Sequence, residues 1–187
     1  KMREAMAKAE LGDDVFEEDP SVNRLEHLAA EMVGKEAALF LVSGTMGNLV
    51  ATLTHTNPGD EVILGAHSHI YGYEVGGISR IGGLIPKTIN DSSGVIRPEM
   101  IVDAIRDENI HFAPSKLFCM ENSHNMSGGR VTTVEQTKKL VKTCREHGLK
   151  IHMDGARIFN AARALGVSAK ALIEPVDSAM FCISKGL

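Results

Sequence analysis

The sequence predicts an α/β fold, in which a mainly parallel central sheet carries helices on both faces. Short apolar runs alternate with helix-like stretches over most of the chain after Glu36. This alternation is typical of parallel strands that are joined by helical crossovers. Polar and charged residues follow directly after several of the apolar runs. Neither an internal repeat nor a low-complexity segment interrupts the pattern, so one fold class accounts for nearly the whole chain.

The expected elements follow from the spacing of apolar residues and from turn residues. Apolar residues at helical spacing up to Val33, with Ser21 as the N-cap and Gly34 as the stop, predict the clearest helix. Further helices are expected at 1–10, 45–53, 70–81, 98–105, 133–147 and from near Arg157 onward. Strands are expected at 37–42, 61–66, 84–89, 117–120, 149–153 and 179–183.

Composition limits the classes of function. The net charge is −4, with 20 basic and 24 acidic residues, so no basic surface for nucleic acid or an anionic membrane is expected. The three cysteines (Cys119, Cys144 and Cys182) show no CxxC spacing, which suits a reducing compartment better than a disulfide framework. No apolar run approaches the length of a membrane span, and no secretory signal is visible. A cytoplasmic protein without a membrane segment is the expectation.

At both ends of the chain, the sequence predicts an element that is cut short. The first residue is Lys1 within a helix-like stretch, and the last residues, Ser184 to Leu187, follow directly after an apolar run. We therefore expect residues 1–187 to form one domain of a longer protein.

Polar residues at the ends of the predicted strands indicate where a ligand binds. The five sets are Ser43-Gly44-Thr45, His67-Ser68-His69, Glu121 to Asn125, Asp154 with Arg157, and Ser184-Lys185. The carboxyl ends of parallel strands meet at one edge of a sheet, and ligands of open α/β sheets bind beyond that edge. The sequence therefore predicts that these residues converge on one site.

Each member of this group also has an ordinary structural interpretation. Gly44 and Thr45 open a helix whose N–H groups suit a phosphate, yet an N-capped turn explains them equally. Lys185 fits a desolvated, nucleophilic lysine or a surface lysine at a strand end. Asp154 fits a buried carboxylate paired with a cationic ring nitrogen or a helix cap. Arg157 fits a bidentate partner for a substrate carboxylate or a helix-surface side chain.

Histidines leave further alternatives open. His69 and His124 each follow a strand end and fit either a structural or a chemical role. A metal site built from His67 and His69 with Glu74 and Glu121 lacks cysteine ligands and helical HxxxH spacing. We therefore expect no metal.

Taken together, these groups match the needs of pyridoxal phosphate. Its aldehyde requires a lysine, its ring nitrogen a carboxylate, its phosphate a helix N-terminus and its ring a flat stacking partner. An amino-acid substrate adds the need for a cation at its carboxylate. The inventory contains a lysine (Lys185), a carboxylate (Asp154), a helix-opening turn (Ser43-Gly44-Thr45), an arginine (Arg157) and two histidines (His69 and His124).

Five blocks resemble the low-specificity L-threonine aldolase family, whose members are pyridoxal-phosphate enzymes of the aspartate-aminotransferase fold. They are Ser43 to Asn48, His69-Ile70-Tyr71, Glu121 to Asn125, His152 to Ala161 and Ser184 to Leu187. The resemblance runs in order over essentially the whole chain. The Asp-Gly-Ala-Arg-Ile-Phe-Asn-Ala block and the Glu-Asn-Ser-His-Asn block are specific to this family.

The resemblance implies a role for each residue that matches the family's motifs. Lys185 matches the lysine that binds the coenzyme covalently, Asp154 the partner of its ring nitrogen and His69 the histidine that stacks on the ring. Gly44 and Thr45 match the phosphate-binding turn. Arg157 matches the arginine that holds the substrate carboxylate, and His124 the histidine near the substrate β-hydroxyl.

The implied reaction is retro-aldol cleavage of L-threonine or L-allo-threonine to glycine and acetaldehyde, with His124 taking the hydroxyl proton directly or through a water. Family members extend further at both ends, with a smaller C-terminal domain, and a neighbouring subunit completes the coenzyme site. The resemblance thus implies a homo-oligomer, a dimer or tetramer, without nucleic acid or membrane partners. Two alternatives stay open: a truncated, catalytically incomplete chain, and another enzyme of this fold that performs β-elimination or transamination.

Overall fold

The computed structural model describes residues 1–185, and it forms two compact units. The first unit covers residues 1–41, and the second begins at residue 42. Gly186 and Leu187 of the Ser-Lys-Gly-Leu block lie outside the described residues. Within the described part of the chain, no helix is both long and apolar enough to cross a membrane.

The first unit consists of helices joined by irregular backbone. It contains α1 (Met2–Lys8), a 3-10 turn (Asp14–Phe16) and α2 (Pro20–Val33). The predicted cap at Ser21 is wrong, because Asp19 caps α2 by accepting hydrogen bonds from the backbone N–H groups of Ser21 and Val22. Pro20 stands in the first turn, where its missing N–H costs nothing.

The predicted strand at 37–42 is also wrong. This segment is irregular, and Leu39 and Val42 are 67% and 88% exposed. An apolar run becomes a strand only where a neighbouring strand satisfies its backbone N–H and C=O groups. No other described segment pairs with residues 37–42.

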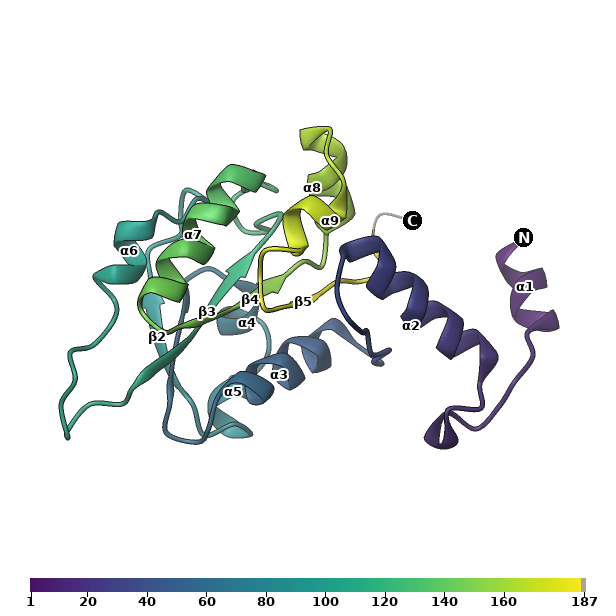
Figure 1. The fold of residues 1–187 in the computed structure, drawn as a ribbon, viewed down its shortest axis with the longest axis horizontal. Coiled ribbons are helices and arrows are strands. Elements are labelled where there is room, and N and C mark those ends of the chain that lie inside the picture. The colour runs from purple at the N-terminus through teal and green to yellow at the C-terminus, as the bar shows by residue number, and fades with distance from the viewer. Residues whose placement is uncertain (186–187) are drawn as a thin grey trace. The chain divides into compact units, whose positions relative to one another are not determined.

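The second unit is built on a five-stranded sheet in the order β2-β1-β3-β4-β5 (Figure 1). The strands are β1 (Glu61–Gly65), β2 (Ile85–Ile89), β3 (Ser115–Glu121), β4 (Lys150–Asp154) and β5 (Ser178–Met180). Every neighbouring pair runs parallel, which confirms the predicted α/β class. The chain moves outward from β1 to β2 and then returns to β3 on the other side of β1. The strand order therefore reverses between β1 and β3.

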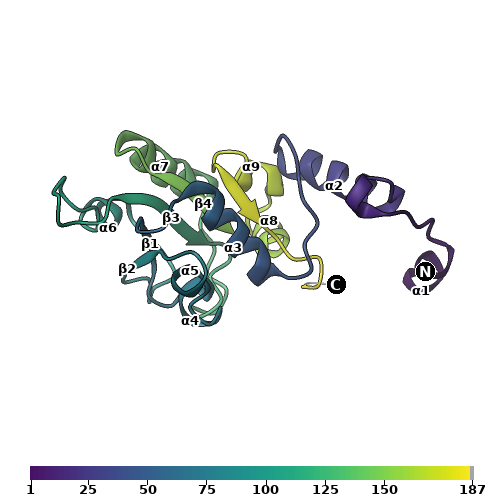
Figure 2. The same ribbon diagram turned by 90° about the horizontal axis from the view of Figure 1, so that it is seen from below.

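Helices cover both faces of this sheet (Figures 1 and 2). One face carries α3 (Gly44–His55) and α5 (Gly77–Arg80), and the other carries α6 (Pro98–Val102), α7 (Val134–Glu146) and α9 (Ala169–Ile173). Two further helices, α4 (His69–Gly72) and α8 (Ile158–Leu165), directly follow the turns beyond β1 and β4. Because both faces are covered, the central strands carry apolar side chains on both faces, and Val62, Phe118 and Ile151 are fully buried.

The single helix expected at 70–81 is instead two short helices, α4 and α5. Between them the backbone of Val75 and Gly76 is left-handed, with φ of 55° and 63°. A left-handed pair cannot continue a right-handed helix, so the chain turns here. This turn places Glu74, which is 5% exposed, inside the protein.

Candidate active site

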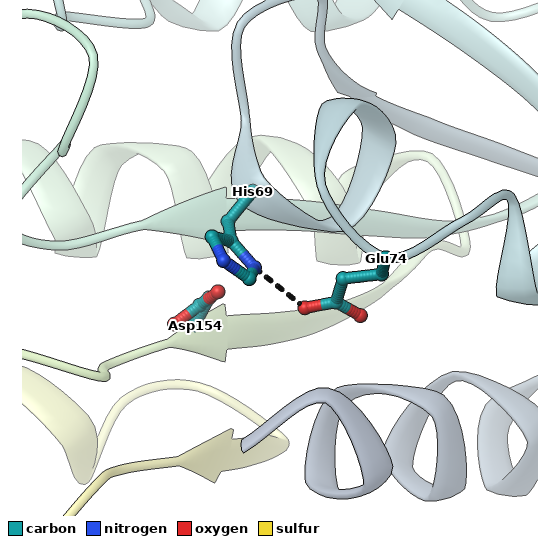
Figure 3. A group of neighbouring side chains, drawn as sticks. All are labelled: His69, Glu74 and Asp154. Carbon is teal, nitrogen blue, oxygen red and sulfur yellow. Dashed lines mark hydrogen bonds and ion pairs between the residues drawn. The ribbon is translucent and has the colours of Figure 1, made fainter. Parts of the chain in front are cut away.

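The carboxyl ends of the strands bring several of the predicted residues together. Asp154 ends β4, Glu121 ends β3 and His69 opens α4 just after β1. The ligand-type atoms of His69, Glu74 and Asp154 all lie within 4.8 Å of one another. Figure 3 shows the three side chains gathered from two segments, the α4 region that carries His69 and Glu74 and the end of β4 that carries Asp154. The predicted convergence of His69 and Asp154 is therefore confirmed.

Asp154 is a buried carboxylate, with 2% of its surface exposed. Its Oδ2 accepts a hydrogen bond of 2.9 Å from Asn48 Nδ2, and its Oδ1 accepts one of 3.0 Å from the backbone N–H of Ala156. An ionised carboxylate offers about four acceptor positions. Asp154 thus keeps acceptor capacity for one more donor.

His69 is held from three directions. Its Nδ1 hydrogen-bonds Glu74 Oε1 at 2.9 Å, and its backbone N–H donates to Glu121 Oε2 at 2.9 Å. The ring of Tyr73 stacks on the imidazole, with centroids 5.6 Å apart and planes inclined by 26°. His69 therefore presents a fixed, flat surface beside Asp154.

Asn48 joins the two carboxylates, and sequence reasoning gave it no role. Its Nδ2 donates to Glu74 Oε1 at 2.7 Å and to Asp154 Oδ2 at 2.9 Å. Asn48 and Glu74 are both buried. Burial raises the pKa of Glu74 above its ordinary value, although the hydrogen bonds from Asn48 and His69 oppose the shift. The only sequence signal for Asn48 is its place within the Ser43 to Asn48 block.

The hydrogen-bond network continues behind Asn48. His152 Nε2 lies 3.1 Å from Asn48 Oδ1, and His152 Nδ1 lies 2.9 Å from Ser178 Oγ, which also contacts His55 Nε2 at 2.7 Å. Burial, and to a lesser extent the neighbouring His55, lowers the pKa of His152 to about 3. His152 is therefore neutral, and the proton on its Nε2 is the one that Asn48 Oδ1 accepts.

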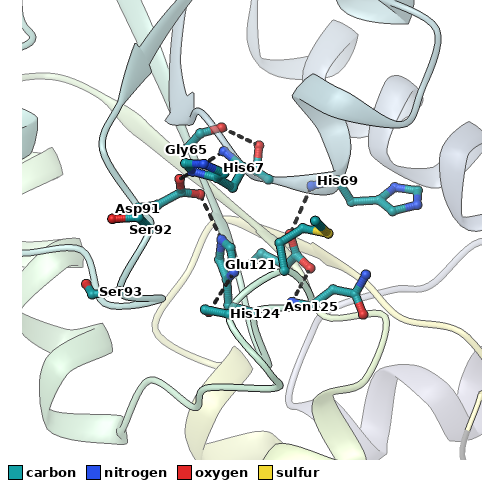
Figure 4. Close-up of polar contacts among 12 residues, drawn as sticks. Gly65, His67, His69, Asp91, Ser92, Ser93, Glu121, His124 and Asn125 are labelled. Carbon is teal, nitrogen blue, oxygen red and sulfur yellow. Dashed lines mark hydrogen bonds and ion pairs between the residues drawn. The ribbon is translucent and has the colours of Figure 1, made fainter.

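His124 lies in a second polar cluster (Figure 4). It is 3% exposed, and its Nε2 contacts Asp91 Oδ2 at 2.7 Å while its Nδ1 contacts Ser127 Oγ at 2.9 Å. Asp91 Oδ1 in turn contacts His67 Nδ1 at 2.8 Å. Burial would raise the pKa of Asp91, but the hydrogen bonds from His124 and His67 bring it below its ordinary value. Both ring nitrogens of His124 thus have protein partners.

Glu121 links the two clusters. Its Oε2 accepts from the backbone N–H of His69, and its Oε1 accepts from that of Asn125 at 2.9 Å. One carboxylate at the end of β3 therefore fixes the turn after β1 and the turn after β3 (Figure 4). The two turns flank the point at which the strand order reverses, where ligands bind in open α/β sheets.

The predicted phosphate turn forms the N-terminus of α3. Ser43 caps this helix by accepting from the backbone N–H of Met46 at 3.1 Å, so the N–H groups of Gly44 and Thr45 remain available to an anion. A Cβ on Gly44 would lie 3.0 Å from Cys182 Sγ and 3.2 Å from the methyl carbon of Met180. The absence of a side chain at Gly44 thus allows α3 to begin close against the segment that leads from β5 to Lys185.

Lys185 and Arg157 are not brought into contact with the other predicted residues. Lys185 is exposed and Arg157 is half-buried at the start of α8. Neither side chain makes a hydrogen bond or an ion pair with any residue among 1–185. Their predicted roles stay predictions.

The trio of His69, Glu74 and Asp154 differs from the metal-ligand set considered from the sequence, because Asp154 replaces His67 and Glu121. Imidazole and carboxylate groups are ligand types for divalent cations. Here, however, Asn48 N–H groups already occupy one oxygen of each carboxylate. The arrangement suits a hydrogen-bonded organic ligand.

Comparison with known proteins gives a consistent result. The family described as beta-eliminating lyase matches residues 1–187. Low-specificity L-threonine aldolase 1 of Arabidopsis thaliana is 52% identical over 190 residues, covering 100% of this chain and 53% of that relative. Low specificity L-threonine aldolase of Escherichia coli K12 is 44% identical, covering 100% of this chain and 55% of the relative. The chain spans about half the length of the curated relatives it matches.

Solved structures agree with the fold. The structure of Leishmania major threonine aldolase superposes with a TM-score of 0.77 at 25% identity, covering 88% of this chain and 48% of that chain. A Listeria monocytogenes structure superposes with a TM-score of 0.85 at 23% identity, covering 99% of this chain and 51% of that chain. The resemblance to threonine aldolases and the aspartate-aminotransferase fold are thereby confirmed. With a family match over its full length, the chain belongs to the beta-eliminating lyase family.

Proposed function

We propose that the protein is a pyridoxal-phosphate-dependent lyase that cleaves L-threonine and L-allo-threonine to glycine and acetaldehyde. The observation that carries this proposal is the buried carboxylate of Asp154, which lies beside the His69 ring at the carboxyl edge of a parallel sheet. Relatives at 52% and 44% identity carry the name low-specificity L-threonine aldolase.

The residues fit the coenzyme. Asp154 has acceptor capacity for a ring N–H, His69 offers a flat surface, and the N–H groups of Gly44 and Thr45 suit a phosphate. When bound, the coenzyme supplies an electron sink for the carbanion that forms when the Cα–Cβ bond breaks. Lys185 would provide the amine that holds the coenzyme covalently.

The remaining residues act on the substrate. Arg157 binds the substrate carboxylate through its guanidinium group. His124 accepts the β-hydroxyl proton, and Asp91, bonded to its Nε2, stabilises the imidazolium that results. Because His124 is buried, the proton reaches it through Ser127 or a water rather than directly.

Assembly, location and domain boundaries are part of the same proposal. We propose a cytoplasmic homo-oligomer, a dimer or tetramer, in which residues 1–187 belong to the large coenzyme-binding domain. Several apolar side chains of the first unit are exposed, as is common at subunit interfaces: Met2, Met6, Leu11, Val15 and Phe16.

The first prediction tests this function in the full-length protein. Addition of pyridoxal phosphate gives a visible absorbance band, borohydride fixes the coenzyme onto the peptide that contains Lys185, and Lys185→Ala abolishes both. Threonine then yields glycine and acetaldehyde in equal amounts. A wild-type protein that gives no absorbance band at any coenzyme concentration contradicts the proposal.

β-Elimination is the second candidate, and the name of the family favours it. An assay with threonine, serine and alanine separates the reactions. Aldol cleavage releases acetaldehyde from threonine, β-elimination releases ammonia and a keto acid from serine, and transamination converts alanine to pyruvate.

A further inference from the structure

We propose that Glu74 is a positioning residue for His69. Its carboxylate accepts the Nδ1–H of the imidazole and so holds the ring in one orientation and, in the neutral ring, in the Nδ1–H tautomer. This inference rests on the proposed function, because the ring that Glu74 orients is the one assigned to stack on the coenzyme. It gives a role in the site to a residue that follows no strand and belongs to none of the five sequence blocks.

The hydrogen bonds at Glu74 Oε1 determine the direction of the His69 contact. Asn48 Nδ2 can only donate, and it lies 2.7 Å from Oε1, so this oxygen already serves as an acceptor. His69 Nδ1 lies 2.9 Å from the same oxygen. A proton taken up by Glu74 would reside on Oε2, because Oε1 already has two donors directed at it. Oε1 therefore accepts from Nδ1–H whether Glu74 is ionised or neutral.

The orientation of Asn48 supports this assignment. An amide could be turned so that its oxygen, rather than its nitrogen, faces the two carboxylates. The two carboxylates prevent this, because an amide oxygen that faced Glu74 Oε1 and Asp154 Oδ2 would set acceptor against acceptor, whereas the oxygen turned the other way accepts from His152 Nε2–H. The amide nitrogen must then face Glu74 and Asp154.

The same contacts couple the two coenzyme-facing residues. Asn48 Nδ2 donates to Asp154 Oδ2 at 2.9 Å as well as to Glu74, so one amide aligns the carboxylate for the ring nitrogen and the carboxylate that holds His69. Tyr73 covers one face of the imidazole, which leaves the opposite face for the coenzyme ring. Glu74 thus orients His69 within its plane while Tyr73 supports it from behind.

The test uses full-length protein with ¹⁵N-labelled histidine, and His69→Asn identifies the His69 signals among those of the eight histidines. Wild type is expected to show the Nδ1–H tautomer at His69. Glu74→Ala loses this preference and weakens coenzyme binding about ten-fold, as expected for loss of a hydrogen bond to a buried carboxylate. Glu74→Gln restores both, because its amide oxygen replaces Oε1 as the acceptor.

Glu61→Gln is the matched control. Glu61 is fully buried in β1, but its carboxylate binds Arg106 at 2.7 Å and Ser115 at 2.9 Å at the opposite end of the strand. It is expected to leave the His69 tautomer and the coenzyme affinity unchanged.

Two results overturn the proposal: an Nε2–H tautomer in wild type, or wild-type tautomer and affinity in Glu74→Ala. If Glu74→Ala does not fold, the proposal is tested by the tautomer of His69 in wild type and in Glu74→Gln. A Glu74→Gln variant that loses the Nδ1–H tautomer also contradicts the proposal. The tautomer is read without coenzyme. A failure to bind coenzyme at all therefore counts against the proposed function and not against the role of Glu74.

Discussion

At the residue scale, the buried His152 makes stability depend on pH. Its pKa is lowered to about 3 in the folded protein, whereas an unfolded chain has an ordinary histidine pKa near 6.5. Between these values the unfolded chain binds a proton that the folded protein does not bind. The contribution of neutral His152 to the free energy of unfolding is therefore fully present above about pH 6.5. It falls by roughly 1.4 kcal/mol per pH unit as the pH is lowered toward 3.

We accordingly expect acidification from pH 7.5 to 5 to reduce the free energy of unfolding by roughly 2 kcal/mol through His152. Urea denaturation at the two pH values measures this change. His152→Gln, whose amide can still donate to Asn48, should lose less stability on acidification than wild type. Equal losses in the two proteins would show that His152 does not cause the pH dependence.

Val75 is a second residue with a measurable effect. Its backbone is left-handed, with φ of 55°, and its side chain is 84% exposed. A β-branched residue is strained in this region, whereas Asn adopts it readily. Val75→Asn should raise the free energy of unfolding by about 1 kcal/mol, as measured by urea denaturation.

The matched control is Val42→Asn, since Val42 is 88% exposed but is not among the residues with positive φ. A comparable gain in this control would mean that loss of an exposed apolar side chain, and not relief of backbone strain, explains the result at Val75.

At the scale of elements, the end of β1 determines where β2 can place Asp91. A Cβ on Gly65 would collide with the Asp91 carboxylate. That carboxylate accepts from the His67 backbone and contacts the rings of His67 and His124. Gly65→Ala should therefore displace Asp91 and lower the free energy of unfolding by about 2 kcal/mol or more, because buried charged groups lose partners.

Gly72→Ala is the control for Gly65→Ala, because a Cβ at Gly72 meets no atom within 4 Å. Urea denaturation should show little change for Gly72→Ala, and the ¹⁵N signals of His124 should shift only in Gly65→Ala. Two variants of equal stability with unchanged His124 signals would contradict the expected displacement of Asp91.

At the scale of the whole molecule, the sequence predicted the sheet better than the polar network. Asp154 and His69 could be placed at one edge because parallel strands bring their carboxyl ends together. Asn48 was given no place there, and Glu74 entered only as a member of the metal-ligand set that was set aside. Asn48 lies inside a helix, and Glu74 lies in a turn that apolar spacing had assigned to a helix.

One further error and one unforeseen set of contacts have the same origin. The apolar run at 37–42 looks like a strand, but strand formation depends on a neighbouring strand that spacing along the chain cannot reveal. His124 follows a strand end as predicted, yet Asp91 and Ser127 occupy both of its ring nitrogens. Both the predicted strand at 37–42 and the contact of His124 with Asp91 depend on partners that lie far away in the sequence.

The hydrogen bond between Asn48 and Asp154 spans 106 positions of the chain. During synthesis, Asn48 leaves the ribosome long before Asp154 exists, at rates of about 5–20 residues per second. For several seconds its side chain therefore lacks Asp154 and His152 as partners, although β1 and β2 can already pair. The cluster of Asn48, His69, Glu74 and Asp154 is consequently a late product of translation, because it cannot form until β4 has joined the sheet.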